Sequence, residues 1–146
     1  MKKTIILLLI LGTFSLARAQ TPQSSDRDAI DKACKDYVEG YYLGDTTRIR
    51  RAMHPELCKR VLPKRANYKI YATTVNDLVK GSLYKKPDPN PSEPFKITVN
   101  VYDVDAGVAT AKISTNKLPF IDYAQLAKID GEWKVVNVLW AYTNDK

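Results

Sequence analysis

The sequence predicts an α+β domain in which helices from the first half of the chain cover one face of a long antiparallel sheet. Two observations carry this prediction. Apolar residues recur with a helical period between Ile30 and Tyr41, and several segments between Phe95 and Tyr142 alternate between apolar and polar residues. Turn residues separate these segments, so the elements can be placed in order.

The first residues have the pattern of an export signal. Met1-Lys2-Lys3 is basic, Ile5 to Leu11 is apolar, and Ala17-Arg18-Ala19 fits a cleavage site. We expect residues 1–19 to be removed, which leaves a single domain over residues 20–146. This predicts a periplasmic or extracellular protein whose mature form has no membrane span, and a mature chain that still begins at Met1 would contradict it.

Much of the positive charge belongs to this leader. Three of the 23 basic residues lie in it, so the net charge of the remaining chain falls from +7 to +4. The other basic residues concentrate in the first half of the chain, and such a cluster suits either an anionic partner or a solvated face. For an exported protein we expect the solvated face and no nucleic acid. The cluster comprises Arg48, Arg50, Arg51, Lys59, Arg60, Lys64 and Lys69.

Three helices and a short hairpin are predicted before the sheet. Ser25 and Asp28 resemble a capping box before the first helix, which Gly44 ends. Asp45 can cap a second helix through Met53, before Pro55. A hairpin is expected from segments 57–62 and 67–73. Thr74 and Asp77 then begin a third helix that Gly81 ends, and a proline-rich connector follows over residues 86–94.

Four long strands are predicted in the second half. Asp130-Gly131 is the strongest hairpin signal, and it precedes the last strand. Strict alternation in that strand places Trp133 and Leu139 on one face and Trp140 on the other. Both faces would then be apolar, which favours a homodimer that packs sheet on sheet through the outer face. The four strands are predicted over residues 95–102, 108–115, 120–129 and 133–142.

Two stretches resemble a known superfamily. Segments 36–45 (DYVEGYYLGD) and 51–56 (RAMHPE) look like the opening helices of nuclear-transport-factor-2-like proteins. Segments 120–123 (FIDY) and 130–140 (DGEWKVVNVLW) resemble the exported bacterial branch labelled "putative lumazine-binding". The resemblance implies a cone in which a curved sheet and the first helix enclose a pocket. The label alone suggests a lumazine or flavin-like ligand, since the sequence shows no cofactor motif.

Ketosteroid isomerase belongs to the same superfamily, and its donor tyrosine resembles Tyr37 in the spacing to Gly44 and Asp45. That enzyme also needs a general-base aspartate. The corresponding position here is Val61, which cannot abstract a proton. The sequence therefore does not predict this reaction.

Six residues are candidates for contact with a ligand. Four of them could line an apolar pocket or could equally fill the core: Tyr37, Tyr41, Trp133 and Trp140. Asp122 lies in an apolar strand register, so it should point inward and either bind a ligand or pair with a lysine or arginine. His54 could act as a general base with Asp122 or Asp103 as its orienting carboxylate and Tyr37 as a donor, or could only end a helix.

Three functions remain open on these residues. The preferred one is a non-catalytic binder with an apolar pocket between sheet and helices. The second is an isomerase, dehydratase or hydrolase that uses His54, Asp122 and Tyr37, and the third is an assembly module with a filled core.

The chain holds two cysteines and one histidine, so no metal site is expected. Cys34 and Cys58 could form a disulfide in an oxidising compartment, or remain two separate thiols.

Overall fold

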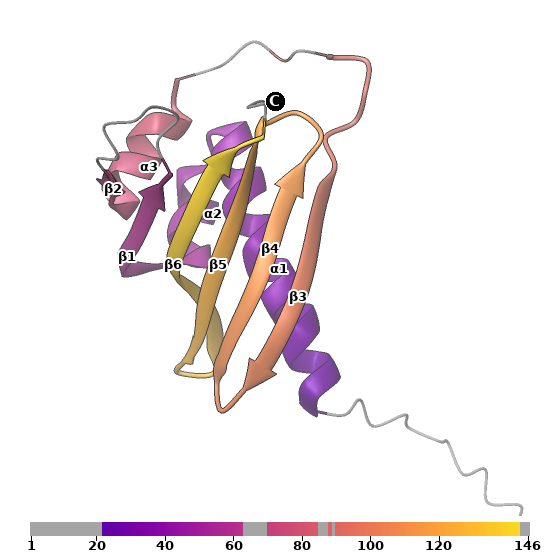
Figure 1. Ribbon diagram of the computed structural model, residues 1–146, viewed down its shortest axis with the longest axis vertical. Helices are drawn as coiled ribbons and strands as arrows, with labels where there is room; N and C mark the ends of the chain where they lie inside the picture. The colour runs from indigo at the N-terminus through magenta and orange to yellow at the C-terminus, as the bar shows by residue number, and fades with distance from the viewer. Residues whose placement is uncertain (1–21, 63–69, 85–87, 89, 144–146) are drawn as a thin grey trace, which may run out of the picture.

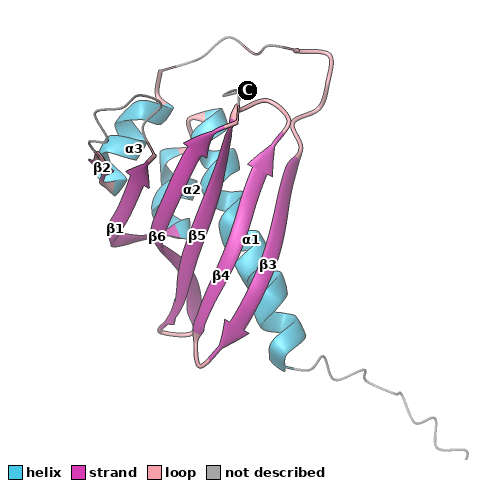
Figure 2. Ribbon diagram, in the orientation of Figure 1, coloured by secondary structure: helices cyan, strands magenta, loops and turns pink. Residues whose placement is uncertain are grey.

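In the computed structural model, which describes residues 22–62, 70–84, 88 and 90–143, three helices lie against one face of a six-stranded sheet (Figures 1 and 2). The α+β class and the cone-like architecture expected from the sequence are confirmed. The expected leader and the turn at residues 63–65 lie outside the described residues. The elements are α1 Pro22–Leu43, α2 Thr46–Ala52, β1 Met53–Val61, β2 Ala72–Thr73, α3 Val75–Ser82, β3 Ile97–Asp105, β4 Val108–Thr115, β5 Phe120–Ile129 and β6 Glu132–Tyr142.

The sheet is mixed, with strand order β2-β1-β6-β5-β4-β3. Strands β3 to β6 form the expected antiparallel meander. Strand β1 adds to its edge in parallel with β6, and the short β2 pairs antiparallel with β1. The parallel contact brings the first half of the chain beside the last strand, and Figure 1 shows α1 behind the sheet, where it contacts β3 and β6.

The helix boundaries follow the expected signals. Gly44 adopts φ +74° after α1, a conformation that favours glycine. The Asp45 side chain accepts a hydrogen bond from the Arg48 backbone N–H at 2.9 Å and caps α2. Thr74 and Asp77 form a reciprocal capping box at the start of α3. The capping signatures of α2 and α3 are thus confirmed, although α3 continues one residue beyond Gly81. The expected capping box at Ser25 and Asp28 is wrong, because α1 already begins at Pro22 and Ser25 lies inside it.

The predicted faces of β6 are wrong, and a bulge is the reason. Gln125 pairs with Asn137 while Leu126 pairs with Val135, so Val136 is an extra residue in the ladder. Side chains on the two sides of a bulge exchange faces. Trp133 and Val135 therefore share the buried, helix-covered face with Val138, and Leu139 points outward.

The core lies between α1 and the concave face of the sheet. Alternate residues of β4, β5 and β6 are buried there beneath one stripe of α1. The stripe matches the helical period seen in the sequence. Residues exposed by less than 2% include Ile30, Cys34, Val38, Ala111, Ile113, Ala124, Leu126, Val135 and Val138.

The disulfide that the sequence allowed does not form, because the two thiols lie on different sides of the sheet. Cys34 is buried in the core, where burial raises its pKa to about 12. Cys58 alternates with Leu57 and Lys59, whose side chains point to the core, so its own points to the outer face. Both cysteines are free thiols.

Most of the described side chains in the basic cluster form an ion pair or a hydrogen bond with another side chain. Arg48 and Arg51 bind Asp36, Arg50 donates to Asn76, and Arg60 donates to Asn137. Lys59 is buried, and the remaining two lysines of the cluster, Lys64 and Lys69, lie outside the described residues.

Asp36 should make the fold sensitive to acid. Burial favours the protonated form, but hydrogen bonds from Lys32, Arg48 and Arg51 outweigh it and lower the Asp36 pKa to about 2. A lowered pKa stabilises the fold above the unfolded-state value near 4, and this contribution disappears as the pH falls towards 2. We expect a loss of about 2 kcal/mol over this range, measured by urea denaturation at several pH values.

The Asp36→Asn variant should lose this part of the pH dependence. Asp28→Asn, an exposed change on the same helix, should behave like the unmodified protein. Equal pH profiles for the unmodified protein and Asp36→Asn would contradict the assignment.

Candidate ligand-binding cavity

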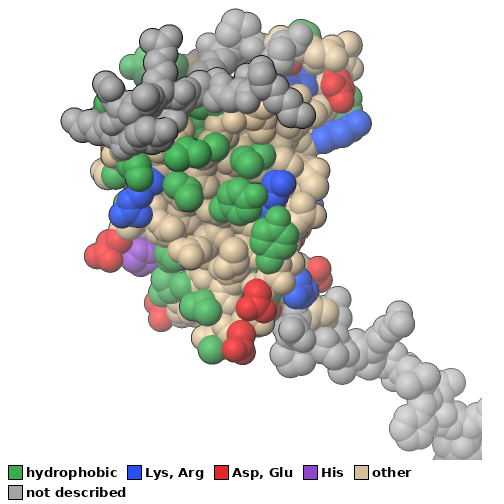
Figure 3. Space-filling view, in the orientation of Figure 1, with side chains coloured by type: hydrophobic (Ala, Val, Ile, Leu, Met, Phe, Trp, Pro, Cys, Tyr) green, Lys and Arg blue, Asp and Glu red, His purple; other side chains and the backbone are tan. Residues whose placement is uncertain are grey.

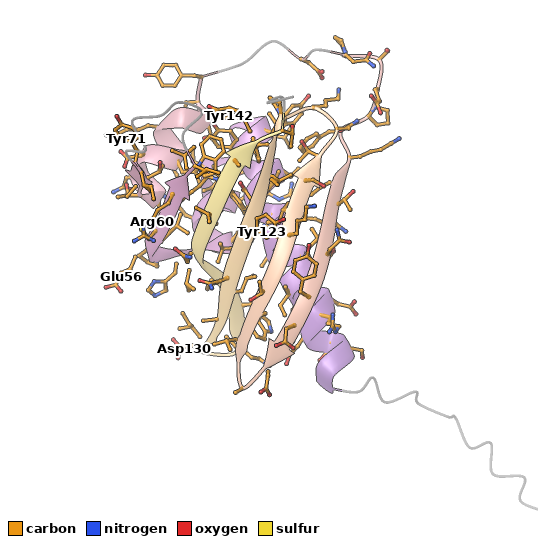
Figure 4. The ribbon with its side chains drawn as sticks, viewed as in Figure 1. Glu56, Arg60, Tyr71, Tyr123, Asp130 and Tyr142 are labelled. Carbon is orange, nitrogen blue, oxygen red and sulfur yellow. The ribbon has the colours of Figure 1, made fainter. Side chains whose placement is uncertain are left out.

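A cavity of about 670 Å³ lies between the end of α1, helix α3, strand β1 and the ends of β5 and β6. The turn between β4 and β5 closes one side. Figure 4 labels Tyr142 at this end of the sheet. Seven aromatic side chains form much of the wall: Tyr37, Tyr41, Tyr42, Tyr84, Phe120, Trp140 and Tyr142.

Three buried polar side chains meet at the wall of this cavity. Tyr37 comes from α1, Lys59 from β1 and Asp122 from β5, and their exposed fractions are 2%, 5% and 0%. Lys59 Nζ lies 2.9 Å and 3.0 Å from the two carboxylate oxygens of Asp122 and 2.6 Å from the Tyr37 hydroxyl. The Tyr37 hydroxyl donates to Asp122 Oδ2 at 2.5 Å. We call these three residues the inner cluster.

The strand order explains why the inner cluster forms. Lys59 is paired with Val138 of β6, and Asp122 is paired with Trp140 of the same strand. Strand β6 lies between β1 and β5, so the lysine side chain crosses one strand to reach the carboxylate. Tyr37 reaches the pair from the helix above the sheet.

The inner cluster is a desolvated ion pair with aromatic walls. Lys59 Nζ lies 5.3 Å from the ring centre of Tyr37, 5.4 Å from that of Phe120 and 5.0 Å from that of Trp140. Burial lowers the pKa of Lys59, and Asp122 opposes that shift. Burial, together with the Asp122 charge, raises the pKa of Tyr37 well above its usual value.

A second lysine, aspartate and tyrosine meet at the rim of the same cavity. Lys117 Nζ lies 2.5 Å from Asp88 Oδ2, and the Tyr42 hydroxyl donates to the same oxygen at 2.6 Å. Lys117 also donates to the Asn90 carbonyl at 2.9 Å, and Tyr42 stacks on Phe95. We call Lys117, Asp88 and Tyr42 the rim cluster. It ties the proline-rich connector to α1 and to the turn after β4.

The structure brings together most of the predicted site residues. Tyr37, Tyr41 and Trp140 line the cavity. Asp122 points inward and pairs with a lysine, one of the two roles expected for it, and contacts the cavity-lining Tyr37 and Lys59. Trp133 lies elsewhere, where its indole N–H donates to Asp26.

His54 does not join Tyr37 and Asp122, so the predicted grouping of these three residues is wrong. The pairing of β1 with β6 is interrupted between Met53 and Cys58, and Pro55 in this interval cannot donate to a ladder. The His54 Nδ1 accepts a hydrogen bond from the Glu56 backbone N–H at 3.2 Å. His54 is half-buried and is not among the residues that line the cavity.

Lys59 and Lys117 were not among the candidates from the sequence. Lys59 belongs to the basic cluster expected at the surface, although it shares one face of a predicted strand with Leu57 and Val61. That register is the signal that could have placed it inside. Lys117 lies in a loop, where the sequence holds no comparable signal.

Among the residues that the structure describes, no three His, Cys, Asp or Glu side chains are grouped so that they could hold a metal ion. None of the helices in this part of the chain has the length and apolar character needed to cross a membrane.

Comparisons with known proteins agree with the fold. The crystal structure of an NTF2-like protein of unknown function from Shewanella baltica is 22% identical, with a TM-score of 0.68 over 83% of this chain and 96% of that one. A ketosteroid isomerase-like protein from Erwinia carotovora atroseptica is 11% identical, with a TM-score of 0.55 over 79% and 94%. The association domain of CaMKII from C. elegans is 10% identical, with a TM-score of 0.56 over 80% and 95%.

No match was found among curated proteins. A family model described as "Putative lumazine-binding" matches residues 25–141, which include every element from α2 to β5 and most of α1 and β6. The chain therefore belongs to this family and has the NTF2-like fold.

Proposed function

We propose that the protein is exported and binds a small, partly apolar molecule in the cavity, without turning it over. The observation that carries this proposal is the cavity itself. Its volume of about 670 Å³ lies in the range of small-molecule sites. The basic leader, apolar run and A-x-A sequence at residues 1–19 support export.

The wall of the cavity favours a flat ligand with a few polar groups. Aromatic rings offer large apolar surfaces with fixed geometry. Polar contacts could come from Lys59 and from the loop and strand residues Thr73, Thr115, Asn116 and Thr143. The family description suggests lumazine, and flavin is a related flat ring system, so both are natural first probes.

Binding can be tested with a variant that fills the cavity. A Cβ added at Gly81 would lie 3.7 Å from the Tyr41 ring, an ordinary contact, and Gly81 lines the cavity, so the side chain of Gly81→Leu should extend into it. We expect lumazine or riboflavin to raise the melting temperature of the unmodified protein, and Gly81→Leu to weaken binding by roughly tenfold or more.

Lys80→Leu is the matched control, because Lys80 is exposed in the same helix. It should bind the probes as the unmodified protein does. If neither probe shifts the melting temperature, the ligand suggested by the family description is wrong. If native mass spectrometry from the original host also shows no retained molecule, the binding proposal itself fails.

We also propose that two copies pack through the outer face of the sheet. Exposed apolar side chains gather on this face across β3 to β6 (Figure 3). They include Tyr102, Val108, Tyr123 and Leu139, whose exposed fractions range from 42% to 58%. A second copy would cover this patch with an identical one.

A further inference from the structure

Two clusters of the same three residue types face one cavity in very different surroundings. The inner cluster holds Lys59 with Asp122 and Tyr37, and the rim cluster holds Lys117 with Asp88 and Tyr42. In the inner cluster, Asp122 and Tyr37 are 0% and 2% exposed. In the rim cluster, the Asp88 side chain is 25% exposed, although Lys117 itself, at 8%, is nearly as buried as Lys59 at 5%.

The surroundings shift the pKa values of the two lysines in opposite directions. Burial lowers the pKa of Lys59, whereas the hydrogen bond to Asp88 raises the pKa of Lys117. A neutral amine is a nucleophile and an ammonium ion is not. Lys59 is therefore a better candidate for covalent chemistry than Lys117. Three aromatic rings around Lys59 Nζ also limit the access of water to it.

We propose that Lys59 captures a carbonyl compound in the cavity: its amine condenses reversibly with an aldehyde or ketone on a flat, mostly apolar molecule and forms an imine. This inference rests on the proposed function, because the carbonyl compound must first enter the cavity. It assigns the class of ligand and the atom that holds it.

The inner cluster contains the groups that this condensation requires. Asp122 Oδ1 lies 2.9 Å from Lys59 Nζ, so it is placed to take one proton from the ammonium group when a carbonyl compound arrives. The neutral amine then attacks the carbonyl carbon through its lone pair, and the new C–N bond forms as the C=O π bond breaks.

Proton transfers complete the step without any change in oxidation state. The carbonyl oxygen takes up a proton from the Asp122 and Tyr37 pair, and the second Lys59 proton passes to the same pair. A further proton on that oxygen lets it leave as water while the C=N bond forms. One carbonyl compound and the Lys59 ammonium group thus give one protonated imine and one water, and Asp122 and Tyr37 return to their starting states.

Reductive trapping tests this directly on the full protein. The probe is 6-methoxy-2-naphthaldehyde with sodium cyanoborohydride as the reductant, which converts the imine into a stable secondary amine. Intact mass spectrometry counts the adducts, and peptide mapping locates them. We expect Lys59 to be labelled at least tenfold faster than Lys117 or any exposed lysine, and Lys59→Arg to abolish the fast labelling. Lys35→Arg, an exposed change on α1, should leave it unchanged.

A second measurement keeps the test decisive if Lys59→Arg does not fold. The compound 2-methoxy-6-methylnaphthalene has the same rings and no carbonyl group. It should occupy the cavity of the unmodified protein and slow the labelling of Lys59 by the aldehyde. If this compound binds, as shown by quenching of tryptophan fluorescence, and Lys59 is not labelled faster than the exposed lysines, the imine proposal is overturned while cavity binding stands. If neither naphthalene binds, both proposals lose their support.

Discussion

Replacing Lys59 by methionine should destabilise the fold by about 3–5 kcal/mol, because the change leaves Asp122 as a buried charge without a counter-charge. Asp122 is fully buried, and Lys59 is the cation within ion-pair distance of it in the described structure. The Tyr37 hydroxyl would still donate to the carboxylate, but one neutral donor does not replace an ammonium group. Urea denaturation near neutral pH measures the loss.

The double variant Lys59→Met/Asp122→Leu distinguishes two free energies. One is the cost of leaving Asp122 charged without a partner, and the other is the net contribution of the ion pair to stability. Apolar residues of similar volume often replace a buried ion pair at little or no cost. We therefore expect the double variant to be more stable than Lys59→Met alone. If the two variants are equally destabilised, the loss arises from packing of the lysine stem and not from the charge.

Tyr37→Phe, a substitution in the same cluster, should destabilise the fold less than Lys59→Met. It removes one hydroxyl that donates to Asp122 and accepts from Lys59, and leaves the ring in the core. The expected loss is about 1–3 kcal/mol, the range for removing a hydrogen bond to a charged group.

Local signals in the sequence were sufficient for the boundaries of α2 and α3, for the end of α1 and for the order of the meander, but not for the start of α1. Gly44, Asp45 and the Thr74/Asp77 box act through contacts with residues within four positions, so the sequence predicts them directly. The alternation of β4 and β5 likewise places Asp122 inward, because no bulge interrupts the strand before it. Interactions of this range need no knowledge of the tertiary structure.

The inner cluster depends on information that no local pattern contains. Lys59 and Asp122 meet only because β1 joins β6 in parallel, a pairing between segments almost 80 positions apart. Strict alternation also does not predict the bulge at Val136, which is why Trp133 was expected on the same face as Leu139. The exclusion of His54 follows from the interruption around Pro55, which shifts the register of β1.

The second large effect concerns the outer face of the sheet, where Leu139→Lys should convert the proposed homodimer into a monomer. One row of paired residues crosses this face from β3 to β1: Asn100, Lys112, Tyr123, Leu139 and Arg60. The middle of the row is apolar and its flanks are polar or cationic. A two-fold axis along the strands would place the apolar middles of two copies against each other and β1 of one copy over β3 of the other.

This arrangement is also favourable for the charges at the edges. Arg60 lies on β1, while Asp103 and Asp105 follow Asn100 on β3, so each copy would place its Arg60 over the strand of the other copy that holds these two carboxylates. Because the axis relates the copies, Leu139→Lys would introduce two ammonium groups into the apolar centre. We expect the dissociation constant to rise on the order of 100-fold, which corresponds to about 3 kcal/mol.

Sedimentation equilibrium over a range of protein concentrations measures this change. Leu43→Lys is the matched control, because Leu43 is also exposed but lies at the end of α1, away from the outer face. It should remain dimeric, and both variants should keep the melting temperature of the isolated fold, since neither position is buried. A protein that sediments as a monomer before any substitution contradicts the homodimer. If the unmodified protein is a dimer and Leu139→Lys leaves it intact, the copies associate through a different surface, and the exposed row from Asn100 to Arg60 needs another partner.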